Sequence, residues 1–130
     1  MTTFKQLGIA KDYDKSLNEM GIVNPTQIQQ EAIPLLLSGR MDLVAQAQTG
    51  TGKTAAYGLP LLHQISPSNK SIQGLVLCPT RELGQQVAKQ LFKYTKYAEN
   101  KVFTEAVYGG APIDKQISAL KRHTQILVDT

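Results

Sequence analysis

Cysteine, histidine and long apolar stretches are scarce in this sequence of 130 residues. Cys78 is the only cysteine, so no internal disulfide can form, which suits a reducing compartment. Neither histidine lies at metal-ligand spacing from another histidine or cysteine, which argues against a structural zinc site. No apolar run reaches the roughly 20 residues of a membrane helix, and the first residues lack a signal-peptide core. We therefore expect a cytoplasmic protein with no membrane partner.

The composition is that of one globular domain. Hydrophobic residues make up 42% of the chain and charged residues 18%, which excludes a disordered segment. Fourteen basic residues stand against ten acidic ones, for a net charge of +4. This excess permits a polyanionic partner such as nucleic acid but does not establish one.

Short apolar runs alternate with longer helical patterns from residue 43 onward. The expected strands are 43–45, 75–78, 103–107 and 125–128, and the expected helices are 53–65, 81–98 and 112–121. Strands separated by helices need crossover connections, which produce a parallel sheet. The strands are apolar almost throughout, as in sheets covered on both faces. The predicted fold is therefore α/β, a three-layer parallel sheet with helices on both faces.

A further helix is expected before this core. Thr26 is a good N-cap, and Gln29 three residues later would complete a capping box. The helix should run to about Leu37, where Ser-Gly forms a stop signal. We divide the chain accordingly into an N-terminal extension, residues 1–40, and the main domain, residues 41–130.

The strongest chemical signal is a glycine-rich loop between an expected strand and an expected helix. It reads Ala47-Gln48-Thr49-Gly50-Thr51-Gly52-Lys53-Thr54. Gly50 and Gly52 allow a tight turn that aims backbone N–H groups at phosphate oxygens. Lys53 would reach the β- and γ-phosphates of a nucleotide, and the Thr54 hydroxyl would bind Mg²⁺. The alternative is a strand-to-helix turn without a ligand.

These residues and three other segments resemble motifs of the bacterial DEAD-box RNA helicases, in the same order along the chain. A-Q-T-G-T-G-K-T resembles motif I, in which Ala47 replaces the first Gly of the common phosphate loop. Residues 21–29 resemble the Q motif, with Phe4 upstream; residues 79–83 read P-T-R-E-L, as in motif Ia; Gly109-Gly110 followed by Gln116 resembles the GG motif. The resemblance implies the N-terminal part of a RecA-like domain of the P-loop NTPase class.

The resemblance also implies roles for individual residues. Gln29 would read the edge of the adenine of ATP, and Phe4 would pack on its face; a capping box and a hydrophobic anchor are the respective alternatives. The residues implied in contacts with the RNA backbone are Pro79, Thr80, Arg81, Gly109, Gly110 and Gln116. A plain N-cap at Thr80 with a surface arginine is the alternative there.

The expected function is that of an ATP- and RNA-binding segment of an ATP-dependent RNA helicase, using ATP and Mg²⁺. The D-E-A-D motif and a second RecA-like domain are absent from these 130 residues, so we expect no hydrolysis from them alone. A non-catalytic nucleotide- or RNA-binding module and a small-molecule kinase are the alternatives. Gly84 and Asp129 depart from the family pattern; a helix-interior glycine costs about 1 kcal/mol.

Overall fold

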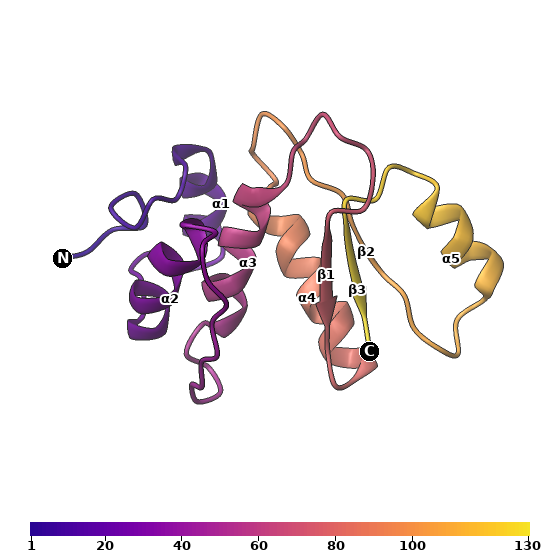
Figure 1. The fold of residues 1–130 in the computed structure, drawn as a ribbon, viewed down its shortest axis with the longest axis horizontal. Helices are drawn as coiled ribbons and strands as arrows, with labels where there is room; N and C mark the ends of the chain where they lie inside the picture. The colour runs from indigo at the N-terminus through magenta and orange to yellow at the C-terminus, as the bar shows by residue number, and fades with distance from the viewer.

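The computed structural model describes residues 1–130 and contains a parallel sheet with helices beside it (Figure 1). In chain order the elements are the 3-10 turn η1 (Lys11–Tyr13), α1 (Asp14–Glu19), α2 (Gln27–Leu37), α3 (Lys53–Gln64), β1 (Gly74–Leu77), α4 (Arg81–Tyr94), β2 (Thr104–Ala106), α5 (Ile113–Leu120) and β3 (Ile126–Asp129). No helix is both long and apolar enough to cross a membrane.

The sheet has the strand order β1-β3-β2, and both strand pairs are parallel. In the register of the central strand, Ile126 faces Gly74 on one side and Thr104 on the other. The α/β class and the parallel sheet predicted from the alternation of strands and helices are therefore confirmed. Each of these strands lies within a residue or two of its expected position.

The expected strand at 43–45 is wrong. This segment belongs to no strand, and Val44 is fully exposed at 100%. A strand exists only where a neighbour supplies hydrogen bonds, and the connection between α2 and α3 lies apart from the three strands (Figure 1). Its apolar sequence reads as a strand, but no strand edge is within reach.

One hydrophobic core joins α4, α3 and the sheet. Val87 and Leu91 of α4 are at most 1% exposed and cluster with Ile126 and Val128 of β3, which are completely buried. α5 lies on the other side of the sheet from α4 (Figure 1) and buries none of its residues. The two helices therefore differ: α4 packs against the sheet, whereas α5 contributes no buried residue.

The first 40 residues, which the sequence set apart as an N-terminal extension, contribute to the same core. The 3-10 turn η1 and helix α1 were not predicted. The hydroxyl of Ser16 in α1 is buried within hydrogen-bond distance of the carbonyl oxygens of Tyr13, at 2.9 Å, and Tyr94, at 2.7 Å. His63 of α3 accepts a hydrogen bond from the Ala10 N–H at its Nε2 and stacks on the Tyr13 ring. These contacts fasten the N-terminal segment to α3 and α4.

Both ends of α2 and the start of α4 follow local sequence signals. The capping box predicted at Thr26 is present, with both of its hydrogen bonds, and α2 ends at Leu37 as expected. Gly39, just beyond, has a φ of 65°, the left-handed conformation that glycine adopts at little cost. α4 begins at Arg81 as predicted but stops at Tyr94, four residues before the expected end.

Candidate nucleotide and RNA-backbone site

The glycine-rich loop has the backbone conformation that its sequence predicts. Gly50 and Gly52 have φ angles of 82° and 79°, and Gly52 is the N-cap of α3. The Thr51 hydroxyl donates to the Gln48 carbonyl at 2.6 Å and closes the turn. Lys53 is the first residue of α3 and is exposed. The loop therefore presents a free helix N-terminus and a lysine together, the arrangement that receives phosphate groups.

The start of α2 is bonded directly to this loop. The Thr26 hydroxyl donates to the Thr51 carbonyl at 2.8 Å. The Gln29 side-chain amide donates to the Gly52 carbonyl at 3.1 Å, while its oxygen accepts from the Thr26 N–H at 2.9 Å. The two residues of the α2 capping box thus have a second role, since their side chains also bond the backbone of the glycine-rich loop.

The contact with Gln29 explains why position 52 must be glycine. A Cβ built on Gly52 would lie 2.2 Å from Gln29 Nε2 and 3.2 Å from its amide carbon. Such a side chain would collide with Gln29 and would also be strained at a positive φ. Gln29 itself is only 1% exposed, with both ends of its amide engaged. The capping alternative is thus realised, and adenine recognition by Gln29 remains a prediction.

Phe4 lies in the hydrophobic core rather than beside the loop. It is 5% exposed, clusters with the buried core residues, and does not line the groove described next. The geometry therefore agrees with the alternative that Phe4 anchors the N-terminal segment. It gives no support to the prediction that the ring packs on adenine.

A groove of about 1180 Å³ runs between the glycine-rich loop and β1. Its walls include Gly50, Lys53 and Thr54 on one side and Leu75 and Leu77 of β1 on the other. The two leucines are 59% and 69% exposed. They lie two residues apart in β1 and so share one face of the sheet. No aspartate, glutamate or histidine lines the groove. The groove can therefore hold an anion beside Lys53, but its walls offer no general base.

Two side chains in the groove wall, Cys78 and Tyr57, have a pKa raised above the ordinary value. Burial raises the pKa of the Cys78 thiol, and Cys78, at 6% exposed, is a small residue of the core. Burial likewise raises the pKa of the Tyr57 hydroxyl, with the nearby Cys78 as a smaller cause. Neither group is set up as a nucleophile.

Binding of a magnesium ion at the loop would require a phosphate ligand as well. Thr54, the second residue of α3, is half-buried and lines the groove, so its hydroxyl is a suitable oxygen ligand. The chain contains no cluster of three carboxylate, histidine or cysteine side chains that could hold a metal by itself. This agrees with the usual Mg²⁺ site, where nucleotide phosphates and waters complete the coordination.

A second group of predicted residues meets where β1 and β2 end. Thr80 is the N-cap of α4 and accepts a hydrogen bond from the Leu83 N–H at 3.2 Å. Arg81 follows, and its Nη1 lies 3.5 Å from the Gly109 carbonyl oxygen. Gly110 has a φ of 87°, and a Cβ there would lie 3.1 Å from Arg81 Nη1. The absence of a side chain at Gly110 thus makes room for the guanidinium.

Gln116 braces this loop from α5 instead of facing outward. Its side-chain oxygen accepts from the Tyr108 N–H at 2.9 Å, and its amide donates to the carbonyls of Tyr108 and Ala111 at 3.0 and 3.3 Å. Its hydrogen-bonding groups are therefore used within the protein, and the direct RNA contact predicted for Gln116 is not favoured. Pro79 is exposed at the edge of the groove, as a residue available to a ligand.

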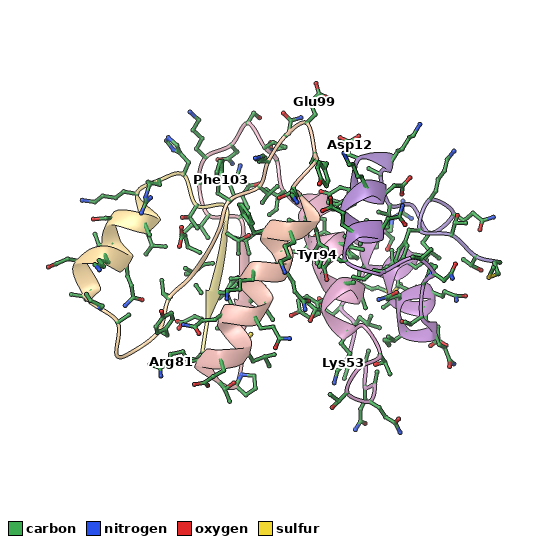
Figure 2. The ribbon with its side chains drawn as sticks, turned by 180° about the vertical axis from the view of Figure 1, so that it is seen from behind. Asp12, Lys53, Arg81, Tyr94, Glu99 and Phe103 are labelled. Carbon is green, nitrogen blue, oxygen red and sulfur yellow. The ribbon has the colours of Figure 1, made fainter.

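Two further residues lie at the site, and neither was expected to make its contact there. Thr26 was expected to cap α2, within the segment that resembles the Q motif, and its hydroxyl also bonds the glycine-rich loop. Tyr108 was not considered, yet Arg81 Cζ lies 5.6 Å from the centre of its ring. An aromatic residue directly before a double glycine was the available signal for Tyr108. Figure 2 shows Lys53 and Arg81 along the lower side of the view, with Phe103 and Glu99 in the upper half.

The fold and the loop define the class as a RecA-like P-loop domain. The sequence of residues 26–130 matches the profile of the DEAD/DEAH box helicase family. Because the match covers most of the chain, this protein belongs to that family.

Its relatives are much longer proteins. The DEAD-box ATP-dependent RNA helicase CshA of Bacillus cereus is 47% identical over 130 residues, which is all of this chain and 24% of that protein. The RNA helicase CrhR of Synechocystis is 50% identical over 129 residues, or 99% of this chain and 25% of its own length. The chain thus spans about a quarter of these relatives.

Solved structures of other proteins superpose on this chain over its whole length. A DEAD box protein of Methanococcus jannaschii superposes with a TM-score of 0.90 at 35% identity and is matched over 35% of its length. Dbp5 of Saccharomyces cerevisiae, bound to RNA and ADP BeF3, gives 0.85 at 30% identity over 32% of its length.

Proposed function

We propose that the full-length protein is an ATP-dependent RNA helicase of the cytoplasm, and that this chain supplies its phosphate-binding loop and part of its RNA-binding surface. A second RecA-like domain outside these residues would complete the machinery. The relatives named above, each about four times longer than the matched segment, support this proposal.

One observation carries the proposal. The glycine-rich loop borders a groove that is also walled by β1 and by Pro79, two residues before Arg81. Because parallel strands end at the same edge, the loop after β1 and the loop after β2 open on one side of the sheet. A nucleotide in the groove and a polyanion on Arg81 would therefore be neighbours, an arrangement in which each ligand could affect the binding of the other.

The phosphate chemistry falls to a few groups. Free N–H groups at the start of α3 would donate to the nucleotide phosphates, and Lys53 would neutralise the β- and γ-phosphates. Thr54 would ligate Mg²⁺, which when bound adds charge neutralisation to the phosphates. The catalytic carboxylate must come from outside the groove, since none lines it.

Selection of adenine would fall to Gln29. Its carboxamide can pair with the N7 and N6 groups of adenine, whereas guanine presents O6 at the same edge. In this structure that amide is bonded to Gly52 and Thr26. The second N–H of the amide and the second lone pair of its oxygen would pair with the base, so that one side chain would contact both adenine and the glycine-rich loop.

RNA would be held by its backbone. The Thr80 hydroxyl and the N-terminus of α4 suit a phosphate, and the Arg81 guanidinium offers two donors to its oxygens. Contacts of this kind read charge and spacing rather than base identity. We therefore expect binding that is independent of sequence and weakened by salt.

The test is ATP hydrolysis by the full-length protein, with and without single-stranded RNA. Lys53→Ala should abolish the RNA-stimulated rate, whereas the matched variant Lys70→Ala, on an exposed loop before β1, should keep it. A rate for Lys53→Ala within a few-fold of the parent would refute the role of the loop. ATP binding without any hydrolysis in the parent protein would instead favour a non-catalytic binding module.

A further inference from the structure

The side chain of Arg81 contacts the loop after β2. Its side chain is 49% exposed, and its partner Glu82 is distant, at 3.9 Å, and 77% exposed. The ring of Tyr108 lies 5.6 Å from its Cζ, within the range of a cation–π contact, and the Gly109 carbonyl lies 3.5 Å from its Nη1. The guanidinium is thus oriented chiefly by the loop after β2.

That loop is itself fixed by α5. Gln116 pairs with both backbone groups of Tyr108, so that its amide acts as a neighbouring strand would. The same amide also reaches the Ala111 carbonyl beyond the double glycine. Tyr108 is half-buried, so its ring has a defined place beneath the arginine. The bracing of Gln116 is thus transmitted through Tyr108 to Arg81.

We propose that Tyr108 is a positioning residue, whose ring presents the Arg81 guanidinium to a phosphate of bound RNA. This proposal rests on the proposed RNA-binding function of the site. It adds to that site a residue, Tyr108, that acts on RNA binding through Arg81. A guanidinium supported on an aromatic ring loses less side-chain freedom when it binds, because its orientation is set beforehand. The N–H donors that are not directed at the Gly109 carbonyl stay free for phosphate.

The experiment measures single-stranded RNA affinity of the full-length protein by fluorescence anisotropy at several salt concentrations. Tyr108→Leu should weaken binding about two- to fivefold, the range expected for a cation–π contact at an exposed site. Tyr108→Phe keeps the ring and should bind as the parent does. Arg81→Ala should weaken binding and reduce the salt slope by about one.

The decisive variant is the double substitution. If Tyr108 acts through Arg81, Tyr108→Leu should have no further effect once Arg81 is alanine. An equal loss in both backgrounds would overturn the proposal, since Tyr108 would then act on RNA or on the loop by itself. ATP affinity and thermal melting of the Tyr108 variants, expected to match the parent, exclude a general folding defect.

The outcomes separate this inference from the proposed function. If Arg81→Ala leaves RNA affinity and its salt slope unchanged, the RNA-backbone role of the site fails. If Arg81→Ala weakens binding while Tyr108→Leu does not, only the positioning role of Tyr108 fails.

Discussion

Substitution of Gly84 by alanine should stabilise the protein. Gly84 lies in the first turns of α4, is buried, and has no positive φ. A Cβ there would lie 3.6 Å from Val128 Cγ1, 3.9 Å from Cys78 Cβ and 4.0 Å from Thr130 Cγ2, all ordinary van der Waals distances. The new methyl group would therefore fill space on the sheet-facing side of α4 without moving its neighbours.

The expected gain follows from two terms. Alanine is favoured over glycine in a helix interior by about 1 kcal/mol. Burial of one methyl group contributes at most about 0.8 kcal/mol more. The sum is roughly 1–2 kcal/mol, which for a domain of this size should raise the melting temperature by roughly 3–8 °C.

Gly58 is the matched control, because it carries the same substitution into the neighbouring helix α3. A Cβ at Gly58 would lie 2.9 Å from Leu91 Cδ2 and 3.5 Å from the Tyr94 ring, and both side chains are fully buried. Overpacking of this kind costs about 1–3 kcal/mol, which cancels or exceeds the helix-propensity gain of about 1 kcal/mol. We expect Gly58→Ala to be neutral or destabilising.

Urea unfolding followed by circular dichroism gives both free energies, with unchanged m-values as the sign that only stability has moved. Hydrogen exchange of the α4 amides in the full-length protein offers an independent reading. Destabilisation by Gly84→Ala, or equal gains at both positions, would show that the spacing of α4 against the sheet and α3 is not as described.

Three further predictions address the ligand, the backbone and the isolated chain. Gln29→Ala should weaken ATP binding in calorimetry and remove the preference for ATP over GTP. Gln27→Ala, on the exposed side of α2, should change neither. Equal binding of ATP and GTP by the parent protein would refute adenine recognition by Gln29. His123, whose φ is 61°, should gain about 1 kcal/mol of stability on replacement by glycine, measured by urea unfolding, and a loss would contradict the left-handed conformation. The 130 residues alone should show no RNA-stimulated phosphate release in a single-turnover assay, because the groove beside Lys53 has no carboxylate or histidine in its wall; release that disappears in Lys53→Ala would refute this.

The sequence by itself determined the local structure of this protein, that is, its turns and helix caps. Gly50 and Gly52 adopt the positive φ angles that the loop pattern requires, and Thr26 forms its capping box with Gln29. Such features depend on residues within one turn of each other, so neighbouring sequence is sufficient to specify them. Parallel pairing was also readable, because strands joined through helices have no other simple arrangement.

Only the tertiary structure decided which long-range partner each side chain meets. Residues 43–45 have the composition of a strand but find no edge to pair with, and Phe4 enters the core instead of facing the groove. The Gln29 amide reaches Gly52, and Tyr108 lies beneath Arg81, across separations of 23 and 27 residues in the chain. Contacts of this kind depend on how helices and strands pack, and no pattern of spacing within one segment contains that information.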